Sequence, residues 1–244
     1  MRNLAIERTN RNRGLRIEIA ADSMRVGKTT AVKVIAEGLR KRGMRVSESY
    51  EDWQHNPYLK KSYADPAKNF LESQKWFIRR KFEQVRDGGE GIFIQDVAPE
   101  TDYNYAETNR RLGRMSEEHF VEYDKFYRSL DWSLAPSPDL LVYLQIGDDE
   151  LIRRALDSKR EFESVEPEYF LMMKRVNREW LKEISNHKFP ARSAYCTAVA
   201  GGSNSQMKIL IVDTDKLDFA HDEGAKRELV ERVVRSCKMM GEGL

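Results

Sequence analysis

The chain has 244 residues, and its 42 basic and 40 acidic side chains leave a net charge of +2, which gives no general attraction to nucleic acid. A hydrophobic content of 40% is sufficient for one α/β core, and no apolar run approaches the roughly 20 residues of a membrane span. Cys196 and Cys237 have no metal-ligand spacing, so we expect reduced thiols and a cytoplasmic protein, with a bridge between the two left open.

Residues 1–14 are rich in arginine and lack the apolar segment of a secretory signal, so we expect a flexible arm in front of a single domain over residues 15–244. Strand-like and helical segments alternate within that domain. The expected strands are Leu15–Ala21, Met44–Ser47, Gly91–Gln95, Leu140–Gln145 and Lys208–Val212. The expected helices are Lys28–Arg40, Pro66–Arg86, Asn104–Leu112, Ser116–Leu130, Asp149–Asp157, Pro167–Asn186 and Asp222–Met239.

This alternation predicts an α/β fold with a doubly wound, five-stranded parallel sheet and helices on both faces. Ligands of such sheets bind beyond the carboxyl ends of the strands. The residues that follow each strand are therefore the candidates for a functional site.

The segment after the first expected strand has the pattern of a phosphate-binding loop, G-x-x-x-x-G-K-[ST], with Asp22 in place of the first glycine. A tight strand-to-helix loop aims backbone N–H groups and a helix N-terminus at one point, which attracts a polyphosphate. We expect Lys28 to reach the β- and γ-phosphates of ATP and Thr29 to bind Mg²⁺. An unpaired carboxylate at Asp22 would repel the phosphates, and Arg25, inside the loop, is the candidate to offset that charge. The residues expected to bind ATP here are Arg25, Val26, Gly27, Lys28, Thr29 and Thr30.

Carboxylates stand at the ends of the second and third expected strands. Glu48 is a candidate general base for a substrate hydroxyl, although a solvated loop residue fits the same position. Asp96 is a candidate Mg²⁺ ligand of the Walker-B kind, and an ordinary strand-to-loop turn is the alternative.

Basic and aromatic residues follow the last two expected strands. Arg154 lies on the expected helix Asp149–Asp157, and Arg160 follows in a polar connection that could close as a lid over a phosphoryl group. After the fifth strand, Asp218 and Phe219 form a turn that could pack against adenine, and Phe219 fits an ordinary core equally well.

Together, these segments resemble the deoxynucleoside kinases, the group of deoxycytidine, deoxyadenosine, deoxyguanosine and mitochondrial thymidine kinases. The likeness is densest over residues 48–74, where Glu48-x-x-x-x-Trp53, Asn56-Pro57-Tyr58-Leu59, Tyr63, Pro66 and Phe70-x-x-x-Gln74 resemble that family's nucleoside-binding segment. Further matches are Met115-Ser116-Glu117-Glu118, Arg154 with Arg160-Glu161-Phe162-Glu163, and Val212-Asp213 with Asp218-Phe219.

The resemblance implies a kinase that uses ATP and Mg²⁺ to phosphorylate the 5′-hydroxyl of a (deoxy)nucleoside, with Glu48 as the general base. It also implies lid arginines at Arg154 and Arg160, an adenine contact at Asp218 and Phe219, and a homodimer. The helices Pro66–Arg86 and Ser116–Leu130 are amphipathic enough to pair in such a dimer. The implied nucleoside contacts are Trp53, Tyr63, Gln74, Phe77, Lys81, Asp102 and Glu163.

The chain departs from the family pattern at Asp22, the first loop glycine, and at Val97, Lys81 and Ser158, where the family has arginines. Loss of one charge-stabilising group typically lowers a rate by about 10²–10³-fold. Two alternatives therefore stay open. One is a non-catalytic relative that keeps the fold as a binding or interaction module, and the other is a kinase for a nucleotide or a modified nucleoside.

Overall fold

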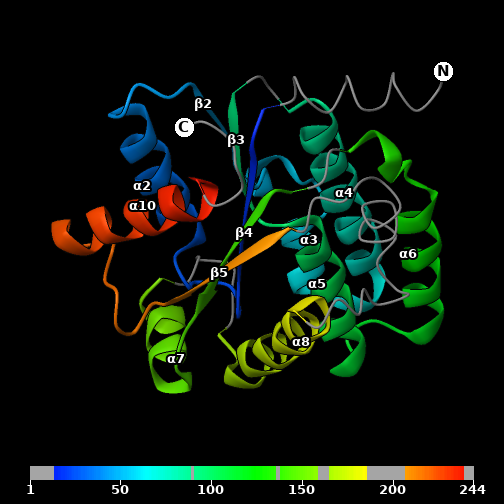
Figure 1. Cartoon of the computed structure of the whole chain (residues 1–244). Helices are drawn as coiled ribbons and strands as arrows, with labels where there is room; N and C mark the ends of the chain where they lie inside the picture. The colour runs from blue at the N-terminus through cyan, green and yellow to red at the C-terminus, as the bar shows by residue number, and fades with distance from the viewer. Residues whose placement is uncertain (1–13, 89–90, 136–137, 159–164, 186–206, 239–244) are drawn as a thin grey trace, which may run out of the picture.

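Five parallel strands form a single sheet in the computed structural model, which describes residues 14–88, 91–135, 138–158, 165–185 and 207–238. The strands are β1 (Arg16–Ala21), β2 (Val46–Ser49), β3 (Ile92–Asp96), β4 (Leu140–Gln145) and β5 (Lys208–Asp213), in the order β2-β3-β1-β4-β5 (Figure 1). Ile19 of β1 pairs with Asp96 of β3 on one side and with Val142 of β4 on the other. The loop that follows β1 therefore begins between the carboxyl ends of two neighbouring strands.

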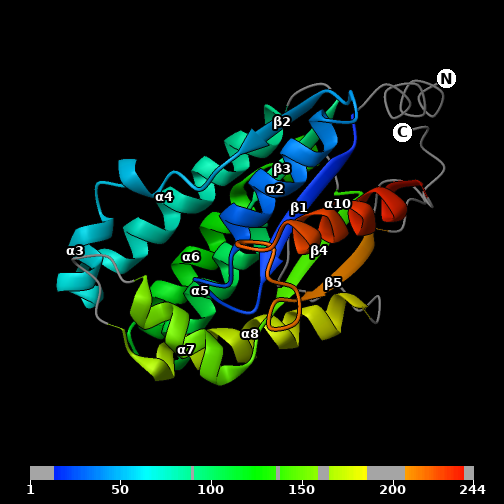
Figure 2. The same ribbon diagram turned by 90° about the vertical axis from the view of Figure 1, so that its left-hand side faces the viewer.

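Helices cover both faces of the sheet, and the central strands are buried as a result. The helices are α2 (Lys28–Arg40), α3 (Leu59–Ala64), α4 (Pro66–Arg86), α5 (Pro99–Arg111), α6 (Glu117–Ser129), α7 (Asp148–Asp157), α8 (Pro167–Ser185) and α10 (Glu223–Lys238). In Figure 1 and Figure 2, α2 and α10 lie on one side of the sheet, and α4, α5 and α6 lie on the other.

The pleat of the strands divides the core between these two layers. Ile19 and Val142 belong to the cluster that contains the buried residues of α2 and α10. Ala20 and Tyr143, their neighbours along the chain, pack instead with Trp180 of α8. This alternation is what period-two side-chain orientation in a strand predicts.

The predicted fold class is confirmed, but two elements have a boundary that differs by two or more residues from the expected one, and one further α-helix was not expected. β2 covers residues 46–49, two residues later than expected, and its four residues are all half-buried, so no apolar pattern marks its ends. α5 begins at Pro99 instead of Asn104, because proline fits the first helical position and acidic residues suit the first turn. The short helix α3 was not predicted.

Among the described residues, no helix combines the length and hydropathy needed to cross a bilayer. The arm expected over residues 1–14 lies, apart from Gly14, outside the described residues, and so do the expected lid residues Arg160-Glu161-Phe162-Glu163 and Cys196.

Candidate active site

The loop between β1 and α2 has the backbone of a phosphate-binding loop. Gly27 stands at the helix N-terminus with a φ of 105°, which side chains other than glycine's rarely adopt. A Cβ placed there would lie 3.5 Å from the ring of Phe219, which supports the loop from the core. The helix that starts at Lys28 points its free N–H groups at the space above the loop, as anion binding requires.

Lys28 lies inside this loop, where its Nζ donates to the carbonyl oxygen of Ser23 over 3.0 Å. Enclosure lowers the pKa of the Lys28 ammonium below its ordinary value, and the nearby carboxylates of Asp96 and Glu51 oppose that decrease. A lysine among such groups is placed to exchange its carbonyl contact for a phosphate.

Asp22 is not the unpaired carboxylate that the sequence suggested. Its carboxylate is wholly buried, and the Arg178 guanidinium of α8 binds it with two hydrogen bonds. Arg178, and not Arg25, therefore supplies the compensating charge.

Thr29 and Asp96 meet at the mouth of the loop. The Thr29 hydroxyl donates to Asp96 Oδ2 over 2.6 Å, and Asp96 Oδ1 is buried with no hydrogen-bond partner among the described residues. An oxygen pair of this kind fits Mg²⁺, which keeps several waters and needs few protein ligands when phosphates supply the rest. The same part of the chain has no group of three acidic, histidine or cysteine side chains that would bind a metal by itself.

A cavity of about 480 Å³ extends from the loop to α4 and α5. It brings together most of the predicted site residues. Those that line it are Arg25, Gly27, Lys28, Thr29, Thr30, Trp53, Tyr63, Gln74, Phe77, Asp96 and Asp102. One end of the cavity is therefore built for phosphates, and the other presents aromatic and hydrogen-bonding side chains.

Glu48 is not part of this cavity, which contradicts its predicted place beside the reacting groups. Its carboxylate binds the Arg40 guanidinium and accepts a hydrogen bond from the Tyr50 hydroxyl. The cavity wall contains Glu51 instead. The reason is the register of β2: because the strand ends at Ser49, Glu48 is still inside it and Glu51 is the carboxylate that follows its end.

The far end of the cavity holds Gln74 and Asp102, both more than nine-tenths buried. Asp102 Oδ2 has no hydrogen-bond partner within the described part of the chain. Burial raises the pKa of this carboxyl to about 7, against the attraction of Lys81. Lys81 itself does not line the cavity, because its Nζ donates to the carbonyl oxygen of Asp96 over 2.8 Å.

Four further predicted residues are described by the structure but do not line the cavity. Val26 and Phe219 are buried beneath the loop, and Asp218 is exposed beside His221. Arg154 donates to the carbonyl oxygen of Val26 over 3.3 Å and to that of Thr214 over 3.1 Å, so it braces the loop from α7. Arg160 and Glu163 lie outside the described residues.

Sequence reasoning missed a cluster where the ends of α5 and α8 meet the cavity. Asn109 donates to the hydroxyl of Tyr169 over 3.3 Å, and the Arg114 guanidinium lies 4.7 Å from the centre of the same ring. Arg114 also pairs with Glu166. No local pattern reveals this cluster, because the two helices that form it are far apart in the sequence. Tyr105 is a further lining residue that was missed.

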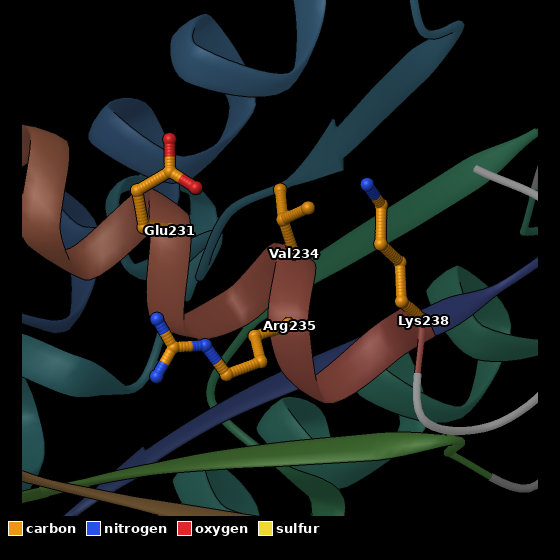
Figure 3. A pocket seen from close by; sticks show the side chains of 4 residues that line it. All are labelled: Glu231, Val234, Arg235 and Lys238. Carbon is orange, nitrogen blue, oxygen red and sulfur yellow. The ribbon is translucent and has the colours of Figure 1, made fainter.

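A hollow on α10 is a poor alternative to this site. Glu231, Val234, Arg235 and Lys238 line it, all from one helix, and Figure 3 shows Arg235 pointing away from the other three. Glu231 is already paired with Arg42. No groups converge there on a common point, so the cavity at the loop is the candidate active site.

Comparison with known proteins matches the chain to one family of enzymes, the deoxynucleoside kinases. A family model described as deoxynucleoside kinase matches residues 21–238. A deoxyguanosine kinase of Lactobacillus acidophilus is 22% identical over 229 residues, which are 88% of this chain and 90% of the relative. A deoxyadenosine/deoxycytidine kinase of Bacillus subtilis is 29% identical over 147 residues, which are 59% of this chain and 65% of the relative.

Solved structures agree on the fold. The deoxyadenosine kinase from M. mycoides, with dCMP and a flexible dCDP bound, has a TM-score of 0.67 and 20% identity, and the match covers 91% of this chain and 100% of that one. The same enzyme with bound dATP has a TM-score of 0.65. The match to the family model spans nearly all of the chain, phosphate loop and cavity included, and confirms the predicted resemblance: the chain belongs to the deoxynucleoside kinase family.

Proposed function

We propose that the chain transfers the γ-phosphoryl group of ATP to the 5′-hydroxyl of a deoxynucleoside, with Glu51 as the general base. The observation that carries the proposal is that one cavity is lined by Lys28 of the phosphate loop, by Glu51 and by Gln74. Phosphate donor and nucleoside acceptor would meet there in line, which is what phosphoryl transfer needs from a protein.

The donor half would be held by the loop and by the start of α2. Lys28 would take up the negative charge of the transferring phosphoryl group, and the amides of the first helical turn would bind the β-phosphate. Thr29 and Asp96 would hold Mg²⁺, which supplies neutralisation of the phosphate oxygens when it is bound.

Glu51 would orient the 5′-hydroxyl and accept its proton. It lines the cavity close enough to Lys28 to influence that side chain's pKa, and among the described residues its carboxylate has no hydrogen-bond partner in the structure. A carboxylate without a competing partner is available to a substrate hydroxyl. The aromatic walls of Trp53 and Phe77 would enclose the nucleoside, and Tyr63 would bind the sugar.

The base end favours a purine. Gln74 both donates and accepts, so it can pair with the Watson–Crick edge of a base. A protonated Asp102 adds a donor, and only purines offer the ring nitrogen N7 as a second acceptor on another edge. The relatives named deoxyguanosine kinase and deoxyadenosine/deoxycytidine kinase support testing purines first.

A homodimer through α4 and α6 is part of the proposal. The two helices pack on each other, joined by Lys75 and Glu122 over 2.5 Å, and Val121 of α6 is 44% exposed. Sedimentation analysis measures the mass of the protein in solution. A monomer at micromolar concentration would contradict the proposed homodimer.

The test is turnover of the four common deoxynucleosides and of 7-deaza-2′-deoxyguanosine with ATP and Mg²⁺. We expect 5′-monophosphate product, purines ahead of pyrimidines, and a marked loss with the 7-deaza analogue. Lys28→Met provides the inactive control. Absence of product with every nucleoside would overturn the proposal, and ATP binding without turnover would point to a non-catalytic module.

A further inference from the structure

The first position of the phosphate loop is held by a buried polar network in place of the usual glycine. Asp22 is 0% exposed, and both of its carboxylate oxygens have protein donors. The Tyr143 hydroxyl donates to Oδ1 over 3.1 Å, and the backbone N–H of Ile146 donates to Oδ2 over 2.9 Å. Arg178 completes the set by donating through Nε to Oδ1 and through Nη2 to Oδ2, the latter over 2.7 Å.

The backbone of Asp22 is fixed as well. Its N–H donates to the carbonyl oxygen of Leu144 over 3.0 Å, which continues the pairing of β1 with β4. Its carbonyl oxygen accepts from Asn177 Nδ2 over 3.0 Å, and Asn177 Oδ1 accepts from Asn104 of α5 over 2.9 Å. Residues of α8 therefore hold both the side chain and the main chain at the point where the loop begins.

The charge of this network depends on one residue. Tyr143 and Ile146 are neutral donors, so Arg178 is the group whose full positive charge lies against the Asp22 carboxylate. Without it, a buried carboxylate would remain beside a loop that has to attract polyphosphate, and burial would weaken its screening by water.

The same helix also forms part of the substrate cavity. Glu166, Tyr169 and Phe170, at and just before the start of α8, line the cavity, and Asn177 and Arg178 follow two turns later. Lys174, between them, donates to the carbonyl oxygen of Ile146 over 2.6 Å. α8 thus connects the wall of the nucleoside cavity to the first residue of the phosphate loop.

We propose that Arg178 is a positioning residue of the phosphate-donor site: by binding Asp22 it neutralises the acidic residue of the loop and fixes the loop against α8. This inference rests on the proposed function, because it concerns the binding of ATP at that loop. It explains how a chain without the first loop glycine keeps a site for anions.

The experiment compares Arg178→Met, Asp22→Gly and the double variant by calorimetry with Mg²⁺ATP and with the deoxynucleoside, beside thermal unfolding. Arg178→Met leaves the Asp22 carboxylate without its positively charged partner, so we expect the Kd of the variant for ATP to increase about tenfold or more, the usual effect of losing a charged hydrogen bond. The nucleoside Kd should remain near the wild-type value. The double variant should regain most of the ATP affinity, because the repelling carboxylate is gone as well.

Arg175→Met is the matched control, since Arg175 lies on the exposed side of the same helix. It should leave both affinities unchanged. An unchanged ATP Kd in Arg178→Met would overturn the inference, and so would equal losses of ATP and nucleoside affinity or a double variant no better than Arg178→Met. If Arg178→Met does not fold, Arg178→Lys, which keeps the charge without the two-pronged geometry, should lose part of the ATP affinity, and full affinity in that variant would count against the role.

Failure of the positioning role of Arg178 can be distinguished from failure of the proposed function. A wild-type protein that neither binds ATP nor phosphorylates any nucleoside would remove the proposed function. If the wild type binds ATP and phosphorylates a nucleoside, and the Kd of Arg178→Met for ATP is unchanged, only the positioning role of Arg178 would be removed.

Discussion

The buried carboxyl of Asp102 should make the stability of the protein fall as the pH increases from about 4 towards neutrality. Its pKa is raised from 3.8 to about 7 by burial, so the native state keeps a proton that the unfolded chain has already released. Between these two pH values the native state binds more protons than the unfolded state, and the free energy of unfolding decreases with pH. Asp102→Asn removes the titration while keeping the size of the side chain.

The difference between 3.8 and about 7 corresponds to about 4 kcal/mol of unfolding free energy once the pH exceeds the native pKa. We therefore expect Asp102→Asn to gain stability relative to the wild type as the pH rises, by an amount approaching that figure above neutrality. Urea denaturation of both proteins at intervals between pH 4 and pH 8 measures it.

Asp87→Asn is a suitable control, because Asp87 is exposed and the Arg86 guanidinium lowers the pKa of its carboxyl. Loss of that ion pair should make Asp87→Asn less stable than the wild type at neutral pH. The stability difference between variant and wild type therefore has the opposite sign to that expected for Asp102→Asn. A stability difference between wild type and Asp102→Asn that stays flat over the whole pH range would refute the reasoning.

Three other predictions test separate parts of the site. Gly27→Ala and Gly113→Ala each place a Cβ at a positive φ and should lose about 1–2 kcal/mol of stability, but only Gly27→Ala should raise the Kd for ATP in calorimetry. Gln74→Ala should lower kcat/KM for the nucleoside about 10–100-fold while the KM for ATP is unchanged, and equal effects on both would contradict its place at the base. Asp96→Asn should raise the Mg²⁺ concentration needed for half-maximal activity about tenfold or more in a metal titration, and an unaltered titration would exclude Asp96 from the metal site.

The sequence alone predicts the parts of the molecule that rest on local patterns. The strand Leu140–Gln145 is a continuous apolar run and forms where expected, because a parallel strand buried on both faces is apolar throughout. Gly27, Lys28 and Thr29 are placed correctly for the same kind of reason, since the loop geometry is set by residues adjacent in the chain.

Glu48 was expected in the cavity that Glu51 lines because β2 gives no such pattern. This strand lies at the edge of the sheet and is short, polar and half-buried, so its end cannot be located from hydrophobic periodicity. A shift of two residues was enough to select Glu48 instead of Glu51. The start of α5 was missed for a related reason, because residues buried there include Glu100, Thr101 and Asp102.

The pairing of Asp22 with Arg178 shows a different limit. The two residues are separated by 156 positions, and only the packing of α8 beside β4 brings them together. A carboxylate that reads as an obstacle to phosphate binding in the sequence is, in the fold, neutralised by a partner that no local pattern identifies.

The most direct measurement is the turnover number of Glu51→Gln and Glu48→Gln, made side by side with saturating ATP, Mg²⁺ and the preferred deoxynucleoside. Removal of a general base typically lowers the rate by about 10²–10⁴-fold, so Glu51→Gln should lose activity on that scale while still binding ATP. Glu48→Gln weakens a pairing with a half-exposed arginine and a hydrogen bond from the Tyr50 hydroxyl, both outside the cavity, and should remain close to the wild type. The opposite result, an active Glu51→Gln and an inactive Glu48→Gln, would contradict the account.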